Sequence, residues 1–316
     1  KAMGTLFEIP NGTIEVTDSI ITYVGENRSS LPEGYSVFDA EGRVVLPGFI
    51  DSHTHLVFGG YRPEEFIWRM KGDSYMSIME RGGGIINTVR ATREISLDDL
   101  KAKAEWYIDV MSHMGITTVE GKSGYGLDKG NELKQLEVMK AINEDPNRKV
   151  DISTTFLGAH AVPTEYKGRE DAYIDFLIDV MLPLVKEKGL AEHCDIFCEK
   201  GVFTVEQSRR LLQAAKERGF GVKIHADEIV SFGGAELAGE LQALSADHLL
   251  HASDTGIQAM AENHVVATLL PLTAFTLREP YARGREMIDR GCAVALATDL
   301  NPGSCCSGSI PLTFAL

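Results

Sequence analysis

Hydrophobic residues in this chain fall into short runs separated by longer stretches of mixed polarity. The apolar run at 44–50 leads directly into Asp-Ser-His-Thr-His at 51–55. A strand covered on both faces has a nearly continuous apolar sequence, so this run predicts a buried strand. Because residues i and i+2 of a strand point to the same side, His53 and His55 should project together. We expect this pair to mark a binding site at the end of the strand.

The chain before this run alternates between apolar and polar residues and turns often. Residues 12–16, 20–25 and 36–42 predict short antiparallel strands, which would form a small β-strand domain over 1–43. The sequence opens abruptly within such strands, and we therefore expect a further strand to precede residue 1.

From residue 44 onward, strand-like runs alternate with amphipathic helical patterns. After the first strand, strands are expected at 116–120, 151–157, 194–199, 221–225, 247–251, 265–270 and 293–299. Helices are expected near 73–81, 97–113, 130–143, 169–188, 204–218, 233–243, 253–262 and 281–290. This alternation predicts an α/β fold, a (β/α)8 TIM barrel over 44–316. A doubly wound sheet is the alternative, but it would not require polar residues at the ends of so many strands. We expect the last helix to continue beyond Leu316.

Composition narrows the classes of function. The 316 residues are 44% hydrophobic and 24% charged, which is ordinary for a globular protein with a large core. A formal net charge of -15 without a basic stripe argues against binding to nucleic acid or to an anionic membrane. Five cysteines, of which Cys305 and Cys306 are adjacent, make a poor disulfide framework. We therefore expect a reducing, cytoplasmic location.

Polar side chains gather at the predicted C-terminal ends of the strands, where barrel enzymes carry their catalytic groups. They are His53, His55, Glu120, Lys122, His160, Glu199, His225, His248 and Asp299. Four of them, from strands one, five and eight, could bind one divalent metal ion, Zn or Fe, and leave a place for water. These candidate ligands are His53, His55, His225 and Asp299.

Other interpretations of single residues stay open at this point. Each histidine alone could be a hydrogen-bonded strand-end residue, and Glu228 could be an exposed loop carboxylate. Cys194 and Cys198 lie four residues apart in one predicted strand, too far apart to bind one ion, so they are predicted to be core thiols.

Several stretches resemble the amidohydrolase superfamily and, more closely, the imidazolonepropionase family. The resembling stretches are 46–60, 82–85, 122–127, 157–160, 225–228, 246–248, 277–280 and 297–303. They span nearly the whole chain. The superfamily shares the His-x-His motif widely, whereas Lys-Ser-Gly-Tyr-Gly at 122–126, His-Ala-Asp-Glu at 225–228 and Asp-Leu-Asn-Pro-Gly at 299–303 are more specific to the family.

The resemblance implies a fold, a reaction and roles for individual residues. The fold would be the amidohydrolase barrel with a small β-sandwich unit from the chain ends, part of it beyond residue 316. The reaction would be hydrolysis of 4-imidazolone-5-propanoate to N-formimidoyl-L-glutamate, a step of histidine degradation. His53, His55, His225 and Asp299 would bind a single Zn or Fe ion, His248 would be the general base, and Glu228 would hydrogen-bond the ring N–H.

The same resemblance implies contacts with substrate or product. Arg62 would bind the propionate, Tyr125 and His160 would hold the ring or carbonyl, and Asn301, Gly303 and Ser304 would contact substrate or product. The fork of an arginine suits a carboxylate, and an acidic protein needs a local cation to receive an anion. In two-metal relatives the position of Lys122 can be a carboxylated bridging lysine. Since one metal is expected here, we interpret Lys122 as lying behind the ligands.

Two alternative functions stay open, and the oligomeric state is a further expectation. The chain could be a related deaminase or cyclic amidase acting on a ring C–N bond, or a non-catalytic barrel scaffold. A scaffold should have lost several ligands, and this sequence retains all of them. Family analogy implies a homodimer.

Overall fold

The computed structural model describes residues 6–28, 30, 33–73, 77–78 and 81–316. The chain separates into two compact units, Lys1–Pro47 and Gly48–Leu316. Each unit is described here by itself.

The first unit contains a two-stranded antiparallel sheet, formed by β1 (Gly12–Thr17) and β2 (Ile20–Glu26). Asp18 and Ser19 connect the strands, both with positive φ, as the tight turn of a hairpin requires. The third predicted strand, at 36–42, is wrong, because these residues carry no regular structure. The expected β-sandwich is correspondingly reduced to two strands within the part of the chain that the structure describes.

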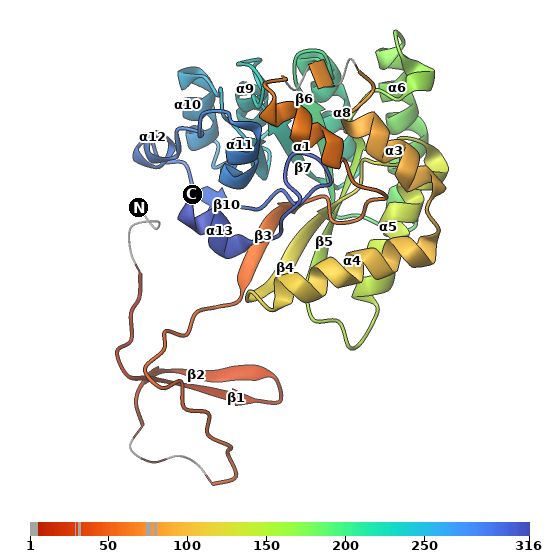
Figure 1. The fold of residues 1–316 in the computed structure, drawn as a ribbon. Coiled ribbons are helices and arrows are strands. Elements are labelled where there is room, and N and C mark those ends of the chain that lie inside the picture. Colours follow the sequence, from red (N-terminus) through yellow and green to blue (C-terminus); the bar gives the residue numbers. More distant parts are fainter. Residues whose placement is uncertain (1–5, 29, 31–32, 74–76, 79–80) are drawn as a thin grey trace. The chain divides into compact units, whose positions relative to one another are not determined.

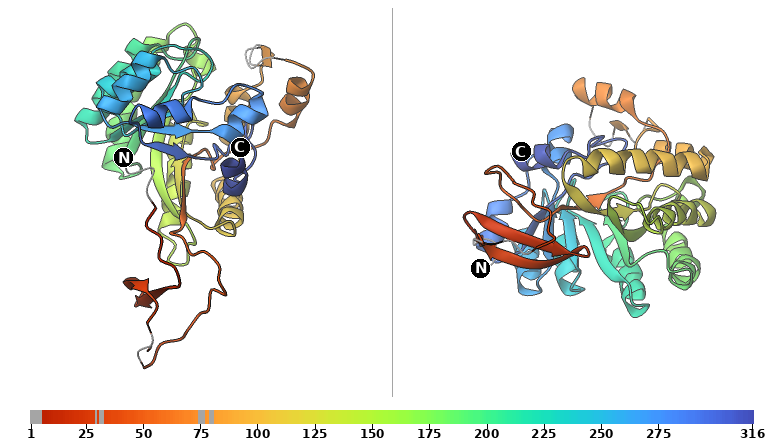
Figure 2. Two further views of the ribbon diagram at one scale, coloured as in Figure 1. Left: turned by 90° about the vertical axis from the view of Figure 1, so that its left-hand side faces the viewer. Right: turned by 90° about the horizontal axis from the view of Figure 1, so that it is seen from below.

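The second unit confirms the predicted barrel. Its strands are β3 (Phe49–Thr54), β4 (Ile116–Lys122), β5 (Asp151–Ala159), β6 (His193–Cys198), β7 (Gly221–Ala226), β8 (Ser245–His248), β9 (Val266–Leu269) and β10 (Val294–Leu296). They form one eight-stranded sheet in chain order, and every pairing is parallel. The sheet curls back on itself, since a bridge joins Thr54 to Leu300, just after β10. Figures 1 and 2 show its helices on the outside of the curved sheet.

The first barrel strand starts later than the hydrophobic run predicts. β3 begins at Phe49, and Val44, Val45 and Leu46 are exposed residues of the first unit. Pro47 has no N–H to donate to a strand ladder, which explains why the strand begins only after it.

The helices of the barrel unit follow the predicted rhythm with additions. They are α1 (Pro63–Met70), α3 (Ile85–Glu94), α4 (Leu97–Ser112), α5 (Lys129–Asn143), α6 (Glu170–Phe176), α7 (Leu182–Glu187), α8 (Val205–Glu217), α9 (Gly234–Glu240), α10 (Asp254–Glu262), α11 (Pro271–Leu277), α12 (Gly284–Asp289) and α13 (Ile310–Ala315). Of these, α1, α3 and α11 were not predicted. The helix expected near 73–81 lies mostly outside the described residues.

The helix predicted over 169–188 contains a change of helical type. A π-helical turn at Leu177–Met181 separates α6 from α7. Pro183 stands at the second position of α7, where its missing N–H cannot continue the regular bonding of the preceding turn.

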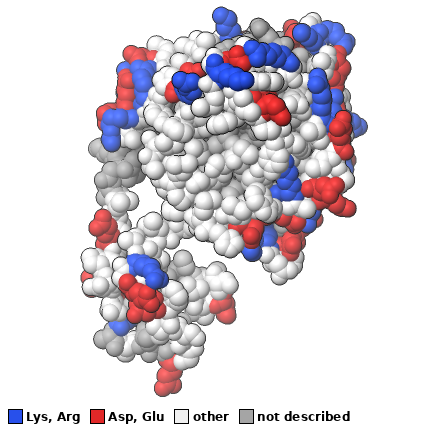
Figure 3. Space-filling model, viewed as in Figure 1, with Lys and Arg blue, Asp and Glu red and all other residues white. Residues whose placement is uncertain are grey.

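Charged side chains lie both on the surface of the barrel unit and inside the barrel. On the face of the barrel unit seen in Figure 3, basic side chains are interspersed with acidic ones around an uncharged middle. The interior contains fully buried charges, which include Lys122, Asp195 and Asp247. Among the described residues, no helix combines the length and the apolar character needed to cross a lipid bilayer.

Candidate metal centre and active site

Three predicted metal ligands come together where β3 and β7 end. The ring centroids of His53 and His225 are 4.6 Å apart, and those of His53 and His55 are 5.2 Å apart. All three rings are almost completely buried. His53 and His55 share one side of the first strand, as their i, i+2 spacing predicts.

Asp299 joins the histidines from the segment after β10. Its Oδ1 atom lies 3.5 Å from Nε2 of both His53 and His55, while its Oδ2 atom accepts a hydrogen bond of 2.8 Å from Thr273 Oγ1. Its backbone N–H donates to the carbonyl of His53, so the segment after β10 is held against β3. Burial raises the pKa of Asp299 to about 6, although Thr273 and His225 oppose the shift. A cation beside this carboxylate would favour its ionised form.

The nitrogen and oxygen atoms of these residues form groups of three that are close enough together to bind one metal ion, and the groups share members. Donor atoms of His53, His55 and Asp299 lie within 4.8 Å of one another, and so do those of His53, His225 and His248. Nε2 of His53 and of His225 is buried without a hydrogen-bond partner among the described residues. Buried polar atoms nearly always have partners, so these nitrogens fit the role of ligands to a divalent cation.

Buried carboxylates orient two of the ligand rings from behind. The Nδ1 atom of His53 hydrogen-bonds Asp247 Oδ2 at 2.7 Å, and Nδ1 of His225 lies 2.9 Å from Asp195 Oδ2. This arrangement leaves Nε2 of each ring for the metal, as in carboxylate–histidine–metal sites. Sequence reasoning missed both aspartates, although a charged residue inside an apolar strand was an available signal.

Neighbouring charges keep these two aspartates ionised, and burial keeps the imidazole of His53 neutral. Burial favours the neutral form of Asp247, but the fields of Lys223 and Lys122 outweigh it and lower its pKa to about 2. For Asp195, burial is outweighed by His225 and Lys122, which hold its pKa well below the usual range. Burial lowers the pKa of His53 well below its ordinary value. Neutral imidazole is the form that binds metal.

His248 and Glu228 stand together beside the ligands. Nδ1 of His248 lies 3.6 Å from Glu228 Oε1, and the His248 ring is 5.4 Å from that of His53. Burial, followed by the field of His225, lowers the pKa of His248 well below its ordinary value. Burial, reinforced by Asp299, raises the pKa of Glu228 well above its own. The imidazole of His248 is therefore neutral in this site, and burial favours the protonated form of the Glu228 carboxyl group.

Tyr125 and His160 form a wall next to His55. The rings of His55 and His160 stack with centroids 4.7 Å apart, and Tyr125 lies 5.1 Å from His160. The loop that carries Tyr125 is held by two buried residues of α5. Glu132 accepts hydrogen bonds from the N–H groups of Gly124, Gly126 and Leu127, and Gln135 accepts one from that of Tyr125. Sequence reasoning missed this support.

Arg62 lies against the loop that follows β10. The backbone N–H of Arg62 donates to the carbonyl of Pro302 at 3.2 Å, and its side chain is 6% exposed. A Cβ atom on Gly303 would lie 1.8 Å from Arg62 Nη2, so any other residue at this position would displace the guanidinium. Nη1 of Arg62 is 3.5 Å from Glu65 Oε2, which supports the guanidinium from α1.

Asn301 organises the same loop from within. Its side-chain oxygen accepts hydrogen bonds from the N–H groups of Gly303 and Ser304, and its Nδ2 donates to the carbonyl of Asp299. The three predicted contact residues of this loop, Asn301, Gly303 and Ser304, thus lie close to both Arg62 and the candidate ligand Asp299.

Not every polar residue at a strand end reaches this site. Lys122 and Glu120 lie in the barrel interior and contact each other, with Lys122 also contacting Asp195 and Asp247. Glu199 accepts hydrogen bonds from the N–H groups of Lys200 and Ile229, so it supports the loop that carries Glu228. Cys194 and Cys198 are buried free thiols, as predicted.

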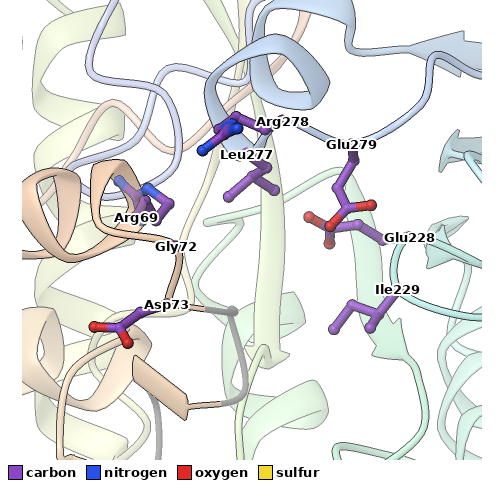
Figure 4. A pocket seen from close by; sticks show the side chains of 8 residues that line it. All are labelled: Arg69, Gly72, Asp73, Glu228, Ile229, Leu277, Arg278 and Glu279. Carbon is purple, nitrogen blue, oxygen red and sulfur yellow. The ribbon is translucent and has the colours of Figure 1, made fainter.

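A cavity of about 370 Å³ opens beside Glu228. It is lined by Arg69, Gly72, Asp73, Glu228, Ile229, Leu277, Arg278 and Glu279. In Figure 4, Arg69 and Asp73 lie across the opening from Glu228 and Ile229. The cavity gives a ligand a route towards the buried carboxyl group of Glu228.

The sequence of this chain is similar to those of known proteins. The amidohydrolase family profile matches residues 36–92. An imidazolonepropionase of Phocaeicola vulgatus is 77% identical over 317 aligned residues, which cover 100% of this chain and 77% of the relative. An imidazolonepropionase of Bacteroides thetaiotaomicron is 69% identical, with 99% of this chain and 76% of the relative covered.

Solved structures share the fold at much lower identity. A guanine deaminase from C. acetobutylicum matches with a TM-score of 0.67 at 16% identity, covering 95% of this chain and 72% of that one. A 5-methylcytosine deaminase from Klebsiella pneumoniae matches with a TM-score of 0.70, also at 16% identity, over 92% and 72% of the two chains.

Proposed function

Because the chain belongs to the imidazolonepropionase family of amidohydrolases, we propose that it opens the ring of 4-imidazolone-5-propanoate. Water adds to the ring carbonyl, the cyclic amide C–N bond breaks, and the product is N-formimidoyl-L-glutamate. The observation that carries this proposal is the buried donor cluster. In it, Nε2 of His53 and Nε2 of His225 have no hydrogen-bond partner among the described residues, and donor atoms of His53, His55 and Asp299 lie within 4.8 Å of one another.

The residues proposed to hold one divalent metal ion, Zn or Fe, are His53, His55, His225 and Asp299. Donor atoms of His53, His55 and Asp299 lie within 4.8 Å of one another, and His225 belongs to a second group of that spacing with His53 and His248. Such an ion polarises a carbonyl and lowers the pKa of water. The chain contributes by fixing the ligands in advance, since Asp247 and Asp195 hold two of the rings. Imidazole and carboxylate suit either metal, so the choice between Zn and Fe is left to metal analysis.

His248 is the proposed general base. It is buried, its lowered pKa keeps the imidazole neutral, and Glu228 lies 3.6 Å away. The neutral ring takes a proton from the attacking water and returns one to the ring nitrogen that leaves. Glu228 is proposed to accept a hydrogen bond from the N–H of the imidazolone, which orients the ring towards His248.

The remaining residues are proposed to hold the substrate. Arg62 binds the propionate through its guanidinium, which offsets the unfavourable field of a chain with net charge -15. Tyr125 and His160 contact the ring or its carbonyl, and Asn301, Gly303 and Ser304 contact substrate or product. Their closeness to Arg62 and to the ligands supports these roles.

The test is an absorbance assay for loss of the imidazolone chromophore, with product analysis. Ring hydrolysis yields the open-chain product without ammonia, whereas a deaminase would release ammonia and leave the ring closed. Stoichiometric ammonia, or an intact imidazolone after long incubation with metal-loaded enzyme, would contradict the proposal.

Two further proposals concern the assembly and the location of the protein. We propose a homodimer, by analogy with the family, which sedimentation would test. We also propose a cytoplasmic location, because all five cysteines, each within the described residues, are free thiols.

A further inference from the structure

Lys122 occupies a position that the proposed reaction leaves without a role. It ends β4 and is completely buried inside the barrel. Its Nζ atom lies 2.7 Å from Asp195 Oδ2, 3.0 Å from Glu120 Oε1 and 3.3 Å from Asp247 Oδ2. One ammonium group thus contacts three carboxylates.

Two of these three oxygens are the same atoms that hold the ligand rings. Asp195 Oδ2 lies 2.9 Å from His225 Nδ1, and Asp247 Oδ2 lies 2.7 Å from His53 Nδ1. The ammonium therefore contacts both histidine ligands through one intervening oxygen each. A displacement of either carboxylate would turn the corresponding ring away from its present orientation.

The three carboxylates around Lys122 need a positive charge between them. Without Lys122, three buried carboxylates would converge. The neighbouring Lys223 hydrogen-bonds Glu120 and the backbone carbonyl of Ser52. Donor atoms of His53, Glu120 and Asp247 lie within 4.8 Å of one another, a spacing that itself suits a cation. Buried carboxylates this close repel one another unless a positive charge separates them.

We propose that Lys122 is a positioning residue of the metal centre, acting as a built-in cation. Its ammonium holds Asp195 and Asp247 as oriented carboxylates, which present Nε2 of His225 and His53 to the metal ion. The proposal rests on the metal binding of the proposed function. It also implies that Lys122 is not carboxylated, because a carbamate would place a fourth anion among three carboxylates.

The test measures metal affinity and ligand geometry separately from activity. Lys122→Met keeps an unbranched side chain, one atom shorter, and removes the charge. We expect a loss of affinity for Zn²⁺ of about 10–100-fold, measured by competition with a chromophoric chelator, because such losses follow removal of residues behind metal ligands. The visible spectrum of the Co²⁺-loaded variant should change, and Lys122→Arg, which keeps the charge, should recover part of the affinity.

Lys134→Met is the matched control. Lys134 on α5 donates to the carbonyls of Thr92, Arg93 and Ile95, so its loss removes hydrogen bonds that a partly buried lysine donates to backbone carbonyls. It should keep the affinity for Zn²⁺ and the Co²⁺ spectrum of the wild type.

Several outcomes separate this inference from the proposed function. A Lys122→Met variant with wild-type Zn²⁺ affinity and Co²⁺ spectrum would overturn the role of Lys122 alone. A wild-type protein that binds no metal would overturn the proposed function itself. If Lys122→Met does not fold, the wild type can be incubated with ¹³C-bicarbonate. The absence of a carbamate signal supports the free ammonium, whereas one carbamate per chain that disappears in Lys122→Arg overturns it.

Discussion

His53 Nδ1 lies 2.7 Å from Asp247 Oδ2, although 194 positions separate the two residues in the chain. The contact exists because β3 and β8 belong to one curled sheet. It gives the His53 ring a defined tautomer, with the proton on Nδ1 and the lone pair on Nε2. The expected effects of several substitutions depend on such contacts between residues that are far apart in the chain.

Removal of metal should abolish turnover and lower thermal stability. The proposed ligands His53, His55, His225 and Asp299 are distant in the sequence and approach one another only in the folded chain, so bound metal stabilises the native state by mass action. Dialysis against a chelator, followed by the absorbance assay and calorimetry, tests this. Readdition of Zn²⁺ or Fe²⁺ should restore both properties, and full turnover after complete removal of metal would exclude the mechanism.

His248→Ala should retain the metal and lose turnover by roughly 10²–10⁴-fold in kcat, the range for a missing general base. The reason is that His248 lies beside Glu228 and is not among the four proposed ligands. Metal analysis and steady-state kinetics of the same preparation check both parts. A near-normal kcat would place the base elsewhere.

Arg62→Ala should raise KM for the propionate-bearing substrate by roughly 10–100-fold, as expected when a charged hydrogen bond worth about 1.5–3 kcal/mol is lost. Arg62→Lys should recover only part of this, because a lysine lacks the bidentate fork. Imidazolones without the carboxylate should be turned over similarly by wild type and variants. An unchanged KM would remove Arg62 from the binding site.

Gly303→Ala should reproduce the effect of losing Arg62. The new Cβ atom would lie 1.8 Å from Arg62 Nη2, so the guanidinium must move. We expect KM to rise while metal content stays at the wild-type level. The matched control is Gly130→Ala, at a surface position of α5 where the nearest atom to a new Cβ is 3.7 Å away. Wild-type kinetics in Gly303→Ala would show that the loop adapts.

Asp247 should make the stability of the metal-free protein depend on acid pH. Burial is outweighed by Lys223 and Lys122, and the folded pKa of about 2 lies below the unfolded value of about 3.9. The contribution of the carboxylate to the free energy of unfolding is therefore complete above about pH 4 and lost as the pH falls through about 2. It amounts to roughly 2–3 kcal/mol.

Urea unfolding of wild type and Asp247→Asn between pH 2 and 6 measures this contribution. The difference in the free energy of unfolding between the two proteins should shrink below pH 4. A difference that is constant over the whole range would show that Asp247 is not ionised by its lysine neighbours.

The positions of most barrel strands could be predicted from local patterns of apolar and polar residues. Each barrel strand was predicted near its observed position because a strand buried on both faces leaves a continuous apolar run, and turns interrupt these runs. The strand predicted at 36–42 was wrong because its apolar alternation carries no information on whether a partner strand exists. The start of the first barrel strand was wrong because the run continues through Pro47, which cannot donate to the ladder.

The sequence by itself determined which residue types stand at the ends of the strands, and the spacing of His53 and His55 placed both on one side of their strand. It could not identify Asp195, Asp247, Glu132 or Thr273 as the residues that hold the site, since a hydrogen-bond partner is chosen by position in space. Only the tertiary structure decided that, because closure of the sheet brings side chains from distant strands into a dry interior. There every charge needs a partner, and Lys122, Asp195 and Asp247 find theirs in one another.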